Sequence, residues 1–316
     1  MNFKNILLSI CLLISAFSFS QKQHTKSFGF VNDNDVYISH TQDQYFTNGM
    51  ALEYRVLAKK TVKKVYKKIY TFAVRQDMYS PFIANVPVKA DQDRPFAGHL
   101  FGSYAITKYF KNQRIFKITY QLGVLGPGSG GEDVQKWYHS WLGLPPINGW
   151  EFQIQNQLSA NVNVFYLKNL AYSGARNFDF NAFAEAKVGT VFNEIGFGFV
   201  SRVSLKSLNP IFNTILFNSN LNDAKTDDAI NEFYFYVKPQ LTYVAYNATI
   251  QGSLFNNDSP LTFKSEPIKA NLQAGLKWAT KRFNFGYFTS WVTKSVDNGR
   301  VTAHKYGTIS MAYKFD

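Results

Sequence analysis

Long segments in which apolar residues alternate with polar or small ones make up most of this sequence. Their period of two residues predicts β-strands, because successive side chains of a strand point to opposite faces. Strands of soluble proteins average about five or six residues, whereas strands that cross a membrane need about ten. Most of these segments have the greater length: 26–37, 47–58, 67–77, 98–110, 113–125, 150–167, 177–191, 194–204, 231–246, 249–255, 270–281, 284–293 and 304–315.

The last segment shows the pattern most clearly. One face carries Gly307, Ile309, Met311, Tyr313 and Phe315, and the other carries Tyr306, Thr308, Ser310, Ala312 and Lys314. An apolar face opposite a mixed one is typical of a strand in a transmembrane antiparallel β-barrel. A soluble β-sandwich with one wet face is the alternative. Bacterial single-chain barrels have an even number of strands, so one of the thirteen segments must be wrong, and 249–255 is the shortest and weakest.

Composition supports an all-β membrane protein of one domain. Aromatic residues make up 17% of the 316 residues and charged residues also 17%, whereas about a quarter is charged in typical soluble domains. So many aromatics exclude a disordered chain. The net charge of +13 suits a phosphate-bearing partner, although the basic run 59–68 is interpreted as a solvated turn on the periplasmic side.

Residues 1–20 predict a secretory signal peptide, which leaves residues 21–316 as the barrel domain. Lys4 supplies the positive start, residues 6–14 the apolar core and Ser18–Ser20 a cleavage site. The apolar run is too short for a membrane anchor. Ile10 before Cys11 is too bulky for lipoprotein processing, and Cys11 is the only cysteine, so the mature chain has neither a disulfide nor a cysteine nucleophile.

One segment, 132–142, has helical spacing instead. Val134, Trp137, Tyr138, Trp141 and Leu142 form an apolar stripe, acidic residues begin the segment, and Gly143 ends it. Gln135 and His139 are four residues apart and share a face away from that stripe. We expect a short extracellular helix packed against the barrel, with the following loop, 145–150, folding back over His139.

Polar clusters interrupt the first strands. Residues 32–37 (NDNDVY) concentrate carboxylate and amide oxygens, which suit a calcium site, although an exposed turn would also explain them. Two further clusters are 41–49 (TQDQYFTNG) and 93–98 (DRPFAG). No G-x-S-x-G, His-Glu-x-x-His, Walker or Rossmann motif occurs, and the sequence assigns no Ser-His pair.

The order of these clusters resembles the LpxR-type lipid A 3′-O-deacylases of Gram-negative outer membranes. The resemblance covers residues 33–150: Asp33-Asn34-Asp35 match one motif, and Asp43, Phe46, Thr47, Asn48 and Gly49 a second. The helix from Gln135 to His139, followed by Gly149-Trp150, is the most specific match.

The resemblance implies a twelve-stranded outer-membrane barrel that hydrolyses the 3′-linked acyloxyacyl ester of lipid A with the help of calcium. Its active site would lie between the barrel wall and the extracellular helix, near the outer leaflet. His139 would be the general base, and Asp35 would bind the metal, with Asn34 contributing an amide oxygen or positioning the ester. Thr47 would hydrogen-bond the metal-site water or the substrate, and Gln135 would orient the His139 ring or the water. We expect a monomer whose partners are lipopolysaccharide and outer-membrane lipids, and no nucleic acid.

Two points remain open in this assignment. Strict alternation puts Asn34 and Asp35 on opposite faces of a strand, so both reach one site only at a bulge or at the end of the strand. The functional lysine of the family has no clear counterpart, because Asp77 occupies the plausible position and Lys89 and Arg94 are only candidates. Alternative functions are a non-enzymatic porin or binding barrel and a Ser-His outer-membrane phospholipase.

Overall fold

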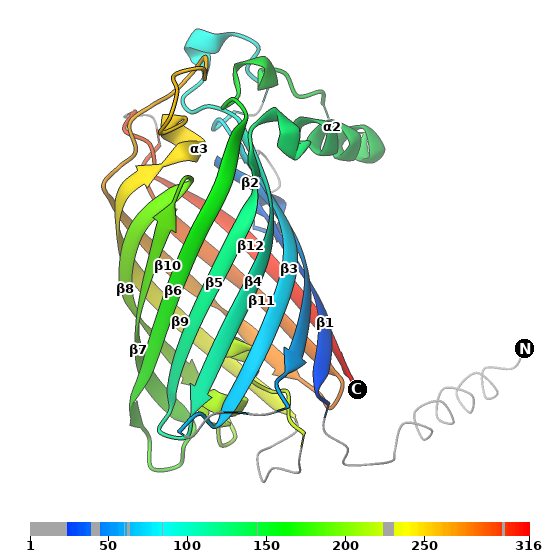
Figure 1. Cartoon of the computed structure of the whole chain (residues 1–316), viewed down its shortest axis with the longest axis vertical. Helices are drawn as coiled ribbons and strands as arrows, with labels where there is room; N and C mark the ends of the chain where they lie inside the picture. The colour runs from blue at the N-terminus through cyan, green and yellow to red at the C-terminus, as the bar shows by residue number, and fades with distance from the viewer. Residues whose placement is uncertain are drawn as a thin grey trace, which may run out of the picture.

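The computed structural model describes residues 24–38, 45–59, 61, 64–83, 85–143, 145–223, 231–298 and 301–316. Within these ranges, twelve antiparallel strands close into one barrel, in which sequence neighbours pair and β1 pairs with β12 (Figure 1). The predicted all-β barrel and its even strand number are therefore confirmed. The predicted signal peptide lies outside the described residues, and no helix within them has the length and apolar character needed to cross a bilayer.

The strands match twelve of the thirteen predicted segments. They are β1 (Lys26–Asn34), β2 (Tyr45–Leu57), β3 (Lys67–Ser80), β4 (Ala97–Phe110), β5 (Arg114–Leu125), β6 (Gln157–Tyr172), β7 (Phe178–Gly189), β8 (Phe192–Val203), β9 (Glu232–Asn247), β10 (Ile268–Ala279), β11 (Phe283–Thr293) and β12 (Ala303–Phe315). The prediction of a strand over 249–255 is wrong. Asn247 accepts a hydrogen bond from the Thr249 backbone N–H and so begins the short helix α3 (Ala248–Gln251).

The predicted extracellular helix is α2 (Gly131–Leu142), and it ends at Gly143 in the left-handed conformation. Short 3-10 helices complete the described elements: η1 (Asp35–Tyr37), η2 (Lys89–Asp91), η3 (Pro127–Ser129), η4 (Trp150–Phe152), η5 (Ile211–Asn213) and η6 (Ile215–Phe217). Figure 1 shows α2 and α3 at one end of the barrel, called the upper end below. The C-terminus and the start of β1 lie at the opposite, lower end, where β2 also ends and β3 begins (Figure 1).

Alternation along the strands separates a lipid-type outer surface from a polar lumen. On β9, the outward Phe233 and Leu241 are 58% and 57% exposed, whereas the inward Tyr234 and Thr242 are buried. The upper and middle lumen holds a cavity of about 480 Å³. Charged side chains of both signs line it: Glu53, Arg75, Asp77, Arg94, Lys117, Glu185, Lys187, Glu194 and Lys269.

The chain leaves β8 at the lower end, and within residues 205–222 it folds into the lumen and fills the lower part of it, while Leu205 itself stays exposed. Leu208, Ile211, Ile215 and Leu221 are at most 6% exposed. They form a hydrophobic cluster with inward side chains of the surrounding strands, namely Ile69, Tyr109, Ile115, Leu167, Phe183, Val200, Tyr234, Tyr236 and Ala279. We call residues 205–222 the lower plug.

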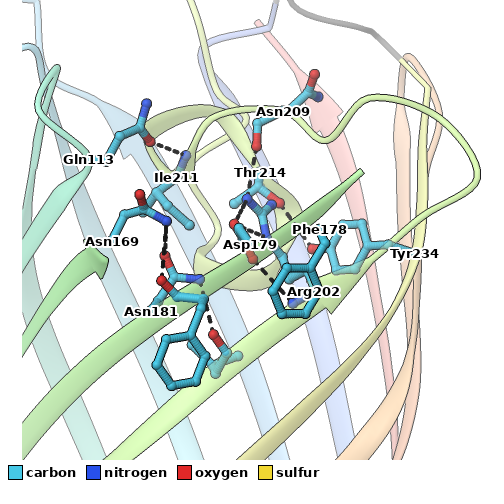
Figure 2. Close-up of polar contacts among 12 residues, drawn as sticks. Gln113, Asn169, Phe178, Asp179, Asn181, Arg202, Asn209, Ile211, Thr214 and Tyr234 are labelled. Carbon is cyan, nitrogen blue, oxygen red and sulfur yellow. Dashed lines mark hydrogen bonds and ion pairs between the residues drawn. The ribbon is translucent and has the colours of Figure 1, made fainter. Parts of the chain in front are cut away.

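Buried polar groups hold the lower plug to the wall (Figure 2). The Arg202 guanidinium pairs with Asp179 at 2.6 Å and donates to the Asn209 carbonyl at 2.9 Å. Lys67 Nζ donates to the Ser219 carbonyl at 2.7 Å and to Asn222 Oδ1 at 2.6 Å. Because both residues are fully buried, the Asp179 carboxylate depends on Arg202 for charge compensation, and Arg202 also lies 3.6 Å from Glu232 Oε1.

Replacing Arg202 with Met will destabilise the barrel strongly, because it leaves the Asp179 carboxylate buried without its cation. We expect the free energy of unfolding to fall by about 3–5 kcal/mol, measured by urea unfolding in detergent micelles. Lys136→Met is the matched control, because Lys136 is exposed in its pair with Glu132 and should change stability by less than about 1 kcal/mol. Equal effects of the two variants would contradict this assignment.

Candidate functional site

The first polar cluster lies where β1 ends. Even-numbered residues of β1 point outward, which places Asn32 and Asn34 on the outer wall, while Asp33 points into the lumen and pairs with Arg75 at 2.5 Å. Asn34 is the last strand residue, and its Oδ1 accepts from the Val36 backbone N–H at 2.8 Å, which caps η1. Asp35, the first residue of η1, is 2% exposed. Because β1 ends at Asn34, Asp35 no longer has to point to the face opposite Asn34.

A bulge at the start of β2 places a second group of polar residues on the same outer wall. Phe46 pairs with Tyr79 and Asn48 with Met78, so Thr47 is the extra residue of the bulge. Thr47 Oγ1 lies 2.5 Å from Ser80 Oγ. Asn48 is the cross-strand partner of Asn34, and both side chains are buried. Asp43, which belongs to the same predicted motif, lies outside the described residues.

Helix α2 packs outside the adjacent part of the wall. It lies beside the upper ends of β3 and β4 (Figure 1), and a Cβ on Gly131 would lie 3.0 Å from the Gly98 backbone. This close approach requires glycine at the start of the helix. Gln135 and His139 are 2% and 8% exposed, so the polar face of α2 is the buried one.

The loop after α2 folds back and fixes both polar side chains, as predicted for 145–150. His139 Nδ1 lies 2.9 Å from the Pro145 carbonyl, which can only accept, so Nδ1 carries the proton. In the neutral ring, Nε2 then carries the lone pair. Trp150 Nε1 donates to Gln135 Oε1 at 2.8 Å.

The loop itself is held rigidly behind the helix. Trp150 is 1% exposed and packs with Phe96 and Ile147. Gly149 has a φ of 110°, and Gln92 Nε2 donates to its carbonyl at 2.9 Å. A side chain at Gly149 would be strained and would also collide with the Val86 carbonyl.

The Tyr37 phenol, just beyond the end of β1, interacts electrostatically with the Tyr138 phenol of α2. Tyr37 of η1 donates to Asn32 Oδ1 at 2.6 Å. Burial raises the pKa of the Tyr37 phenol, and the neighbouring Tyr138 phenol and Asp33 carboxylate raise it further. Tyr138 precedes His139 on α2, so this turn of the helix lies within electrostatic reach of η1. Asn34, Asn48 and Thr47 share the outer wall at the upper ends of β1 and β2, Asp35 follows Asn34 directly, and Gln135 and His139 lie on the buried face of α2.

The side chains at the ends of β1 and β2 offer hard oxygen atoms as metal ligands. The Asp35 carboxylate, the Asn34 and Asn48 amides and the Thr47 hydroxyl suit calcium better than a transition metal. Among the described residues, no group of three or more His, Cys, Asp or Glu side chains gathers as a metal site. A calcium ion here would accordingly need amide, backbone or water oxygens besides Asp35.

The remaining residues considered as counterparts of the family lysine, Arg94, Asp77 and Lys89, lie elsewhere in the fold. Arg94 donates to the Tyr45 carbonyl and to Thr249, and it stacks over Tyr79, so it ties the upper loops together. Asp77 is in the lumen and pairs with Arg75. Lys89 is exposed on η2.

Sequence analysis named Asn32 within the cluster 32–37 without giving it a role, and it missed Ser80; both belong to the outer-wall region, and the alternation of Asn32 with Asn34 could have indicated the first of them. A buried Ser-His pair also exists, since His99 Nε2 lies 2.7 Å from Ser159 Oγ. These two residues are sixty positions apart in sequence, on β4 and β6, so only the closed barrel reveals their contact.

Comparison with known proteins agrees with this architecture. LpxR from Salmonella typhimurium has a similar fold, with a TM-score of 0.75 at 20% identity over 92% of this chain and 100% of that chain. The β domain of the Bordetella autotransporter BrkA matches more weakly, with a TM-score of 0.49 at 9% identity over 93% and 100% of the two chains. No curated protein matches the chain. The model of the family described as outer membrane protein LpxR matches residues 6–315, and the chain therefore belongs to that family.

Proposed function

We propose that the protein is a calcium-dependent esterase that removes the 3′-linked acyloxyacyl chain from lipid A in the outer membrane. Family membership supports this substrate class. The observation that carries the proposal is the His139 imidazole, buried on the outer wall with Nδ1 fixed by the Pro145 carbonyl. A site on the outside of the wall can accept a lipid laterally from the leaflet, without a path through the lumen.

His139 has the geometry of a general base. Its Nε2 lone pair would take a proton from a water molecule as the water oxygen attacks the ester carbonyl carbon. The Pro145 carbonyl and the nearby C-terminal end of α2 would stabilise the resulting imidazolium. The same proton would then pass to the sugar oxygen that leaves, which yields a free 3′ hydroxyl and a carboxylate.

The remaining residues would bind and orient the ester. Asp35, with Asn34, would hold calcium, whose positive charge would stabilise the oxyanion that develops on the ester carbonyl. Thr47 is placed to hydrogen-bond substrate or water beside these residues. Gln135 accepts from Trp150 through Oε1, which aims its amide group and makes it a positioning residue.

We place the site at the outer leaflet. The short connections and the termini of bacterial barrels lie on the periplasmic side, and here both described termini lie at the lower end. The upper end, with α2, would then face outward.

The structure offers less support for the two alternatives. The lower plug fills the lower part of the lumen, which a porin would keep open. The His99–Ser159 pair lies on the inward faces of its strands, with both side chains at most 1% exposed, and His99 Nδ1 has no hydrogen-bond partner that would orient the ring. A phospholipase site would need to face lipid.

Lipid A from cells that produce the protein will lack the 3′ acyloxyacyl group, and His139→Ala will leave that group in place, since no base remains to activate water. Mass spectrometry of lipid A from calcium-supplemented membranes measures both results. Ser159→Ala is the control and should still remove the chain. Intact lipid A in the presence of folded wild-type protein would refute the proposal.

Chelation of calcium will abolish hydrolysis, and returning calcium will restore it. Asp35→Asn removes the negative ligand, so we expect the calcium concentration for half-maximal activity to rise at least about tenfold. Asp258→Asn, at an exposed carboxylate, should not shift that concentration. An unchanged calcium dependence in Asp35→Asn would remove this residue from the metal site.

Trp150→Phe keeps an aromatic ring against Phe96 but deletes the hydrogen bond to Gln135. We expect kcat to fall about threefold to tenfold, as for loss of one hydrogen bond worth on the order of 1 kcal/mol, with KM little changed. Steady-state kinetics on purified lipid A measures the split. Tyr243→Phe, at an exposed tyrosine on the outer wall, is the control, and an equal loss of kcat there would argue against a positioning role for Trp150.

A further inference from the structure

Two exposed tryptophans stand on the face of α2 that points away from the barrel. Trp137 and Trp141 are 65% and 70% exposed. Their rings stack in parallel, with centroids 6.2 Å apart and an interplanar angle of 2°. Because they are one helical turn apart, they form a single aromatic surface on the side opposite Gln135 and His139.

This surface continues the lipid-facing surface of the barrel wall. Outward apolar side chains of nearby strands are strongly exposed: Val74 in the middle of β3 is 58% exposed, and Leu122 and Leu158, close to the upper ends of β5 and β6, are each 64% exposed. Leu158 pairs with Val124, close to the point where the chain leaves β5 toward α2. Helix α2 therefore begins where the apolar wall ends, and it lies outside that wall (Figure 1).

Tryptophan has chemistry that suits this level of a membrane. Its ring is large and apolar, yet its N–H needs a polar partner, so tryptophans gather where acyl chains meet headgroups. The barrel wall has one outward tryptophan near each end. Trp291 lies near the upper end of β11, and Trp278 lies near the lower end of β10. On α2, the neighbouring Lys136 and Glu132 pair with each other and can remain among polar headgroups.

We propose that Trp137 and Trp141 anchor α2 in the headgroup–acyl boundary of the leaflet around the upper end of the barrel. The continuity of the tryptophan surface with the apolar wall selects lipid over a second protein as the occupant. The helix that carries His139 inward thus contacts membrane lipid on its other side. If the proposed function holds, this contact also sets the height of the catalytic histidine above the acyl chains of the substrate.

Fluorescence quenching tests the anchor independently of enzymatic activity. The variant with Trp137→Phe and Trp141→Phe keeps two aromatic rings and leaves Trp150, Trp278 and Trp291 as the remaining indoles. The difference in emission between wild type and this variant reports the pair alone. The protein is reconstituted in phosphatidylcholine vesicles brominated near the carbonyl end of the acyl chains, and iodide serves as the aqueous quencher.

We expect bromine to quench at least about half of the emission of the pair, and iodide to quench little of it. Quenching by iodide alone would show that the pair stands in water, and protection from both quenchers would show that protein covers it. Either result overturns the proposal.

A second variant, Trp137→Ser with Trp141→Ser, removes the aromatic surface but leaves Gln135 and His139 in place. We expect KM for lipid A embedded in vesicles to rise at least about fivefold, with kcat on a short-chain ester in detergent unchanged. Lack of any hydrolysis by wild type would count against the proposed function only, because the quenching result stands without it. An unchanged KM in a hydrolytically active double variant would contradict the anchor.

Discussion

Polar side chains on the lipid-facing wall of a barrel must be paired or covered, because hydrocarbon offers them no hydrogen bonds. Here Asn32, Asn34, Thr47 and Asn48 all stand on that wall at the upper ends of β1 and β2. The end of a strand and one bulge create this departure from alternation, and α2 packs against the neighbouring strands β3 and β4. The polar side chains of the site and the helix beside them therefore occur together at this end of the barrel.

The packing of α2 against the wall also decides which of its side chains are available for catalysis. A helix that packs its polar face against the wall brings Gln135 and His139 under the protein and leaves Trp137 and Trp141 outside. The returning loop supplies one acceptor, the Pro145 carbonyl, and one donor, Trp150 Nε1, and these fix the histidine tautomer and the glutamine orientation. Behind the loop, Gln92, Phe96 and Gly149 keep those two partners in position. The rigidity of the site therefore comes from the loop 145–150 and not from the strands alone.

Much of the barrel was predictable because a strand that faces lipid on one side must alternate, and that period is visible in single segments such as β9 and β12. The weak segment 249–255 failed because a local side-chain cap, Asn247, outweighed apolar composition. The lower plug could not be predicted, because its apolar residues follow neither a helical nor a strand period. Their burial depends on contacts with inward side chains of strands that are distant in sequence. Pairs such as Arg202–Asp179 and His99–Ser159 likewise depend on strand register.

For the site, sequence motifs identified the candidate residues, but they did not predict the contacts that these residues make in the fold. The helix and the foldback of 145–150 followed from spacing and from Pro145. The Thr47 bulge did not, because Asn48-Gly49 would suggest a turn, whereas Gly49 lies inside β2, where a Cβ would crowd Asp33 and Arg75.

A crystal structure of the protein with calcium and a non-hydrolysable lipid A analogue tests the central claim most directly. The account predicts an ion bound by the Asp35 carboxylate at roughly 2.3–2.6 Å, on the outer wall, with the ester group of the analogue between that ion and His139 Nε2. An ion held in the lumen, or an ester bound far from the imidazole, would contradict it.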